Sequence, residues 1–118
     1  MRDHTKLKAF AQADALAVRT YGATARFPKE EQFGLTAQMR RAAVSIPSNI
    51  VEGCARESQA DYLHFLVVAY GSSRELQYQI SLAGRLGYLD KAAHDALHRD
   101  CTDLTKILNG LIRSLRRR

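Results

Sequence analysis

Polar residues at helical spacing stand in two segments of the chain, where they could form a network or a site. An α-helix turns by about 100° per residue, so four of them would share roughly 80° of one helix: Arg41, Ser45, Asn49 and Glu52. An antiparallel neighbouring helix would bring Glu75 level with Arg41, where guanidinium and carboxylate can form a bidentate ion pair. We expect these five residues to form a structural polar network, with a solvated face as the alternative.

Metal and catalytic motifs are incomplete. His94 and His98 have the i, i+4 spacing of two zinc ligands, but Asp95 stands where zinc proteases carry glutamate and the sequence places no third ligand. A di-iron bundle needs Glu-x-x-His pairs, whereas Glu75 is followed at that spacing by Tyr78. The sequence also lacks a nucleophile elbow and a phosphate-binding glycine loop. We therefore expect no catalytic residues, no metal and no cofactor, and hence no enzyme.

The elements that would position these residues are all helical. Apolar spacing predicts four helices and no strand, spanning about 6–24, 36 to between 53 and 57, 59–86, and 91 onward. The candidate N-caps, in chain order, are Asp3 or Thr5, Thr36, Ser58 (with Asp61 as a capping box) and Asp90. Because the connections are mostly short, residues 1–118 are predicted to form one all-α domain, an up-down-up-down antiparallel four-helix bundle.

Pro47 lies inside the second helix, where it lacks an N–H group and clashes with the preceding turn, so we expect a kinked second helix.

Each helix of a lone bundle needs one apolar stripe. The predicted core stripes are Leu7, Phe10, Ala17 and Tyr21 on the first helix; Leu35, Met39, Ala43, Ile46, Ile50 and Cys54 on the second; Tyr62, Phe65, Leu66, Ala69, Leu76, Ile80 and Ala83 on the third; and Leu97, Cys101, Leu104, Leu108, Leu111 and Leu115 on the fourth.

The second and third helices carry more apolar surface than a lone bundle can bury. The additional residues line up on another side of each helix, and an aligned apolar patch usually meets a partner. Gly71 adds to this, since a glycine inside a helix often marks the close approach of another backbone. We therefore predict an oligomer interface between copies, made of Val44, Val51, Val67, Val68, Gly71, Tyr78, Leu82 and Leu86.

The chain is basic, with 18 Lys and Arg against 12 Asp and Glu and a net charge of +6. In an up-down-up-down bundle, the end of the fourth helix lies beside the start of the first and the turn between the second and third. Eight cations are therefore expected to gather at one end, which we call the basic end: Arg2, Lys6, Lys8, Arg56, Arg113, Arg116, Arg117 and Arg118. These are the candidate nucleic-acid-binding residues, although helix-terminal cations also stabilise the helix dipole.

The cysteines and the hydropathy pattern bear on localisation. Cys54 and Cys101 lie among apolar residues and form no metal-ligand cluster, which is typical of buried free thiols in a reducing compartment. No apolar run is long enough to cross a membrane, and the first residues lack the apolar core of a secretory signal. The expected localisation is cytoplasmic, without a membrane partner.

Two long segments resemble a known family. "LTAQMRRAAVSIPSNIVEGCAR" and "DYLHFLVVAYGSSRELQYQISLAGRLGYL" closely resemble the bacterial four-helix-bundle family named for proteins encoded in intervening sequences of 23S rRNA genes. The resemblance covers about residues 6–115, and its most specific motifs are Arg-Ala-Ala-x-Ser-Ile-Pro-x-Asn-Ile-x-Glu-Gly at 41–53 and Gly-Ser-x-x-Glu-Leu at 71–76. Val51 departs mildly, since the family more often has alanine there.

The resemblance implies a left-handed up-down bundle assembled as a ring-like homopentamer. It also implies kinship with the accessory protein of diversity-generating retroelements, a basic pentameric barrel that binds nucleic acid and a reverse transcriptase. The family itself has no established activity.

We therefore predict a non-enzymatic, oligomeric nucleic-acid-binding module, with RNA or a ribonucleoprotein preferred on kinship alone. Sequence preference should be weak, because the sequence shows no aromatic platform for stacking bases. The alternative is a protein–protein interaction scaffold for a genomically linked partner, with no nucleic-acid role.

Overall fold

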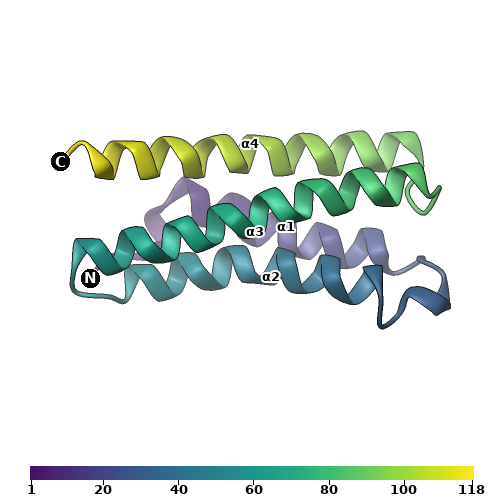
Figure 1. The fold of residues 1–118 in the computed structure, drawn as a ribbon, viewed down its shortest axis with the longest axis horizontal. Helices are drawn as coiled ribbons and strands as arrows, with labels where there is room; N and C mark the ends of the chain where they lie inside the picture. Colours follow the sequence, from purple (N-terminus) through teal and green to yellow (C-terminus); the bar gives the residue numbers. More distant parts are fainter.

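The computed structural model describes residues 1–118 and contains four long helices and two short 3₁₀ turns. The helices are α1 (Lys8–Thr24), α2 (Leu35–Cys54), α3 (Gln59–Arg85) and α4 (Lys91–Arg116), with 3₁₀ turns at His4–Lys6 and Lys29–Glu31. Successive helices run antiparallel in a bundle about 45 Å long, and both termini lie at the same end (Figure 1). Each helix packs against two neighbours, α1 and α3 against α2 and α4, while the backbones of the diagonal pairs α1–α3 and α2–α4 stay further apart. The predicted all-α antiparallel bundle is confirmed.

The helix starts follow the expected capping chemistry in two of four cases. The Ser58 hydroxyl accepts a hydrogen bond from the Asp61 N–H at 3.1 Å, and the Asp90 carboxylate accepts one from the Ala93 N–H at 2.7 Å. These side chains satisfy backbone donors that the first turn leaves unpaired. Gly87, which has a positive φ of 78°, allows the tight turn between α3 and α4.

The other two caps differ from the predictions. Thr36 is buried within the first turn of α2 and caps nothing; instead, the Glu31 carboxylate reaches forward to accept the Leu35 N–H at 3.1 Å. Asp3 caps the 3₁₀ turn through the Thr5 N–H, and α1 begins at Lys8 without a side-chain cap. In both cases a 3₁₀ turn precedes the helix, at His4–Lys6 and at Lys29–Glu31, and a carboxylate of that segment takes the capping role.

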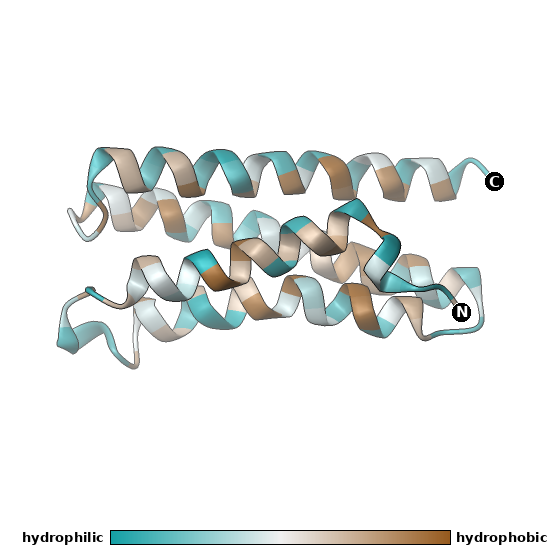
Figure 2. Ribbon diagram, turned by 180° about the vertical axis from the view of Figure 1, so that it is seen from behind, coloured by the Kyte–Doolittle hydropathy of each residue, from teal (hydrophilic) through white to brown (hydrophobic).

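The core is apolar along the axis of the bundle, and hydrophobic residues recur along all four helices (Figure 2). Every predicted core residue of α2 is buried, as are all but one in each of α3 and α4. Phe65 and Leu111 are only partly buried, and Ile112 takes the core position that Leu111 was expected to fill.

The predicted stripe of α1 was wrong. Leu7, Phe10 and Ala17 flank the core and Tyr21 is 46% exposed, whereas the residues that face the core are Ala9, Ala13, Leu16, Thr20 and Thr24. The last two are polar, and each hydroxyl donates to the carbonyl one turn earlier at 2.8 Å. This hydrogen bond offsets the cost of removing the hydroxyl from water. An apolar-periodicity argument passes over such residues.

The second helix runs without interruption through Pro47. The expected kink therefore does not break the hydrogen-bonded helix, and the degree of bending stays a prediction. No helix is both long enough and apolar enough to cross a membrane.

Candidate nucleic-acid interface

The N-terminal segment, the α2–α3 turn and the end of α4 meet at one end of the bundle (Figure 1). The Arg2 N–H donates to the Cys54 carbonyl at 2.8 Å, and the Gln59 side chain donates to the Leu115 carbonyl at 3.4 Å. These bonds join the start of the chain to the end of α2, and the start of α3 to the end of α4. The structure therefore brings together the three segments from which the basic end was predicted.

Two of the eight predicted cations contact other side chains of the chain, and a third lines a different groove. Arg56 pairs with Glu52 one turn earlier, and the Arg2 guanidinium lies 3.9 Å above the Tyr62 ring, a cation–π geometry. Lys8 lines a separate groove between α1 and α4, together with two aspartates. The remaining five are exposed and form no ion pair, and we call them the free basic cluster: Lys6, Arg113, Arg116, Arg117 and Arg118.

The charges at this end affect the pKa values of two buried groups, Cys54 and Tyr62. Burial raises the pKa of the Tyr62 hydroxyl and of the Cys54 thiol, since both lose water around their charged forms. Arg2 opposes the shift of each pKa, and Arg118 also opposes that of Tyr62. The nearby Asp3 carboxylate acts in the other direction and raises the pKa of Cys54.

The predicted ion pair between Arg41 and Glu75 does not form in the single chain. Both side chains are exposed, and the Glu75 carboxylate instead accepts a hydrogen bond from Gln79, one turn along α3, at 3.2 Å. Glu52 likewise pairs within its own helix, with Arg56. Exposed partners gain little from an ion pair in water, so local i, i+4 contacts satisfy these carboxylates.

The rest of the polar network is present and joins α2 to α3. The hydroxyls of Ser45 and Ser72 lie 2.9 Å apart, and Asn49 donates to the Ser45 carbonyl at 2.7 Å and to its hydroxyl at 3.0 Å. Ser72 was missed by sequence reasoning, although it stands in the Gly-Ser-x-x-Glu-Leu motif directly opposite Ser45. This part of the predicted network is a bond between helices, while Arg41, Glu52 and Glu75 do not belong to it.

The two histidines of the zinc-like motif have structural contacts. Their rings stack with centroids 5.5 Å apart, and the His94 ring occupies the space where a Cβ on Gly84 would lie, at 2.7 Å. His94 also bonds to Asp95 at 2.9 Å. The structure contains no group of three or more His, Cys, Asp or Glu residues that could hold a metal ion.

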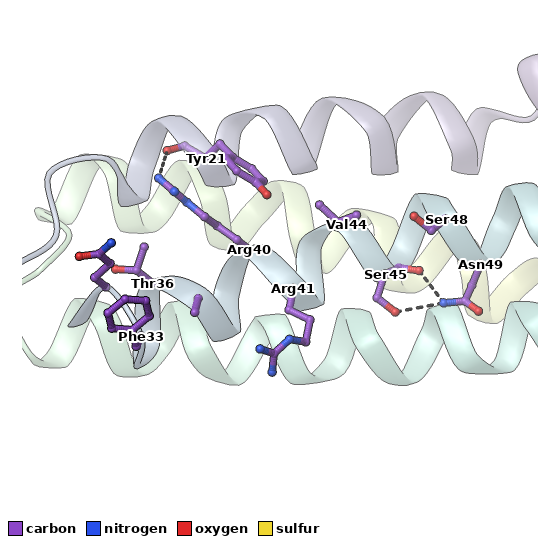
Figure 3. A pocket seen from close by; sticks show the side chains of 11 residues that line it. Tyr21, Phe33, Thr36, Arg40, Arg41, Val44, Ser45, Ser48 and Asn49 are labelled. Carbon is purple, nitrogen blue, oxygen red and sulfur yellow. Dashed lines mark hydrogen bonds between the residues drawn. The ribbon is translucent and has the colours of Figure 1, made fainter. Parts of the chain in front are cut away.

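An open groove of about 780 Å³ runs along the outer side of α2, and α1 contributes Tyr21 to its lining (Figure 3). We call it the α1–α2 groove. Phe33, at one end, is 89% exposed, and Arg40 lies over the Tyr21 ring at 4.6 Å while donating to the Thr24 hydroxyl. Arg41 points away from Arg40 and is unpaired (Figure 3). Sequence reasoning placed Phe33 in a loop and found no exposed aromatic platform, because only the fold shows that this ring has no cover.

Most of the predicted oligomer interface is exposed in the single chain. Val44, Val67, Val68, Tyr78 and Leu86 are 38–61% exposed. A Cβ added at Gly71 would meet no atom within 4 Å. No neighbour within the chain therefore accounts for that glycine.

Two predicted interface residues are already partly buried within the single chain. Leu82 is half-buried and packs against the core, and Val51 is also half-buried, so each would offer only its remaining exposed surface to an interface. Their assignment to the interface stays a prediction.

These features define the class of protein: a basic four-helix bundle with a second, exposed apolar surface and no metal cluster. The chain belongs to the 23S rRNA-intervening sequence protein family, whose model matches residues 5–110. It is also similar to a crystal structure from Bacteroides thetaiotaomicron, described as a protein of unknown function from the S23 ribosomal protein family. The TM-score is 0.80 at 25% identity, over 88% of this chain and 97% of the other. No curated protein matches the chain.

Proposed function

We propose that this protein is a non-enzymatic, homo-oligomeric module that binds nucleic acid through its basic end, with RNA or a ribonucleoprotein as the target. The observation that carries the proposal is the free basic cluster. Five exposed cations without carboxylate partners belong to the N-terminal segment and the last turns of α4, two segments that meet at one end of the molecule (Figure 1). Cations that are not already paired can neutralise backbone phosphates and release condensed counterions.

Local carboxylates reduce the charge of this end without cancelling it. Glu52 forms an ion pair with Arg56, and the Asp3 carboxylate accepts hydrogen bonds from the Thr5 N–H and hydroxyl. Hydrogen bonds from Thr5 lower the pKa of Asp3, so it stays ionised at neutral pH. Arg116 and Arg117, at the opposite terminus of the chain, have no such neighbour in ion-pair distance.

Self-association would multiply a weak single-site affinity. The exposed surfaces of α2 and α3 support assembly, and we propose a closed ring, with five copies as the expected number. Five copies at +6 each would carry about +30. Linked binding sites on one particle convert modest contacts into avidity without any new contact.

Fluorescence anisotropy with mixed-sequence single-stranded RNA at about 50 mM salt tests the proposal, since low salt favours phosphate contacts. We expect replacement of Arg116, Arg117 and Arg118 by serine to weaken binding at least about tenfold. A matched control replaces Arg26, Lys29 and Arg85 by serine, which removes the same charge from exposed positions outside the basic end. The control should bind nearly as tightly as the unmodified protein.

Equal binding by both triple variants would show that net charge alone drives the interaction and would contradict a site at the basic end. Absence of binding to any RNA or DNA would overturn the proposal and favour the interaction scaffold for a genomically linked protein. Competition between RNA and DNA of the same sequence tests the preference for RNA.

A further inference from the structure

The exposed large hydrophobic side chains fall into two groups on different helices. Apart from Met1, none lies outside these groups, and α4 presents none at all. The first group lies on α1, on α2 and just before α2: Val18, Tyr21, Phe33 and Val44, of which all but Val18 line the α1–α2 groove. The second group lies on α3 and its C-cap: Val67, Val68, Tyr78 and Leu86. Two unlike apolar surfaces on one molecule suit a head-to-tail contact, in which each copy uses a different surface towards each neighbour.

The two surfaces also differ in their charged residues. The α1–α2 groove is lined by Arg40 and Arg41 and by no carboxylate. Arg40 is held by Tyr21 and Thr24, which leaves Arg41 as the free cation of the groove (Figure 3).

The surface on α3 offers one carboxylate, Glu75, that can pair with Arg41, and the exposed Arg74 beside it donates to the Tyr70 hydroxyl. Glu75 is exposed one turn before Tyr78 and Gln79, and its hydrogen bond comes from the neutral Gln79 side chain. One turn earlier, Gly71 has open space where a side chain would stand, so another backbone can approach closely there.

We propose that the α1–α2 groove is the docking site for α3 of a second copy of this chain, with Arg41 of one copy paired to Glu75 of the next. The apolar side chains around the groove, including Phe33 and Val44, then cover Tyr78 and Val67 of the neighbour. Because the contact joins unlike surfaces, its repetition closes a ring if the rotation between copies allows it. This inference rests on the self-association proposed above and names the surfaces that form it.

The same two residues stand at one level of neighbouring helices, since Ser45 and Ser72 meet one turn away. A contact within one chain must therefore be distinguished from a contact between chains. Charge reversal with mixing does so. In Arg41→Glu the groove becomes acidic, and in Glu75→Arg the α3 surface becomes basic, so each variant alone places like charges at the contact.

We expect each single variant to raise the concentration for half-assembly at least about tenfold, measured by light scattering or sedimentation. A mixture of the two variants should associate again, because the acidic groove of one accepts the basic α3 surface of the other. In a closed ring of five, about four of the five contacts can alternate in this way, so association between the two variants, rather than a complete ring, is the expected result. The double variant should assemble as well. Lys106→Glu, an exposed charge reversal on α4 outside both surfaces, is the matched control and should leave assembly unchanged.

Assembly of both single variants at the unmodified concentration would overturn the inference while leaving self-association intact. Rescue in the double variant without rescue in the mixture would also overturn it, because the pair would then lie within one chain. A monomeric unmodified protein would instead contradict the proposed self-association itself, and RNA binding by that monomer would leave the role of the basic end standing.

Discussion

Gly53 lies where an added side chain would collide with α3. It is buried near the end of α2, where an added Cβ would lie 2.9 Å from the Phe65 Cβ and 3.2 Å from the Tyr62 carbonyl. Gly53→Ala should lower the free energy of unfolding by about 1–3 kcal/mol, because α3 must move away. Gly110→Ala, in open space on α4, is the control and should raise it by roughly 0.5–1 kcal/mol through helix propensity. Equal effects in denaturant titration would contradict this account of α2–α3 packing.

The thiol of Cys101 should be unreactive in the folded protein. It is fully buried, donates to the Ser73 carbonyl, and burial raises its pKa from 9.0 to about 12. At pH 8 the thiolate would be about one part in ten thousand, so alkylation should be far slower than in denaturant. Fast alkylation of the native protein, read by mass spectrometry of the Cys101 peptide, would contradict this burial.

The same shift has a consequence for alkaline stability. A folded-state pKa above the unfolded one means that the protonated Cys101 thiol contributes stability below about pH 9, and this contribution is lost as pH rises towards 12.

Among the elements, the two loops at the end away from the basic end are joined by one carboxylate. Glu31 accepts the Leu35 N–H through one oxygen and the Tyr88 hydroxyl through the other at 2.9 Å. The hydrogen bond from the Leu35 N–H has the larger effect on the pKa of the Glu31 carboxyl, and together with the bond from Tyr88 it lowers this pKa from 4.5. The same hydrogen bond to Glu31 raises the pKa of Tyr88. Glu31 thus starts α2 and holds the α3–α4 turn.

Tyr88→Phe should lower stability at pH 7 and leave it nearly unchanged at acidic pH. A depressed folded-state pKa contributes stability above about pH 4.5, which is lost as pH falls through the folded-state value. Melting curves of the unmodified protein and the variant should therefore converge in acid. A difference that persists when Glu31 is replaced by alanine would show that the Tyr88 hydroxyl acts through another group.

The helices themselves were largely predictable because their capping and core residues lie close together in sequence. Ser58 and Asp90 cap as expected, and the stripe of α2 is buried as predicted. The face of α1 was not predictable from hydropathy, since Thr20 and Thr24 are buried only after their hydroxyls bond to the preceding turn. Such local bonds compensate for a polar side chain in a way that an apolar pattern does not record.

At the scale of the whole molecule, the exposed surface of α3 predicts assembly. Tyr78→Asp replaces a 61% exposed ring and should leave the monomer folded while dissociating the oligomer. Light scattering at micromolar concentration should give a multiple of 13.2 kDa for the unmodified protein and 13.2 kDa for the variant. A monomeric unmodified protein at all concentrations would contradict the prediction.

The candidate site was predictable only in its broad placement. Antiparallel topology brings the end of α4 beside the N-terminal segment and the α2–α3 turn, which carry Arg2 and Arg56 (Figure 1). Which cations remain free depends on side-chain contacts, such as Arg2 over Tyr62, that spacing does not reveal. The pairing of Arg41 with Glu75 within the chain was wrong for the same reason: residues at one level need not point towards each other.

The central claim is that the free basic cluster contacts phosphates, and the salt dependence of RNA affinity tests it most directly. Log affinity should fall linearly with log salt concentration, since each neutralised phosphate of a single strand contributes about 0.7 to the slope. Replacing Arg116, Arg117 and Arg118 by serine should reduce the slope by about 2 or more while the oligomer stays intact. An unchanged slope in this variant, or an affinity of the unmodified protein that does not vary with salt, would contradict the claim.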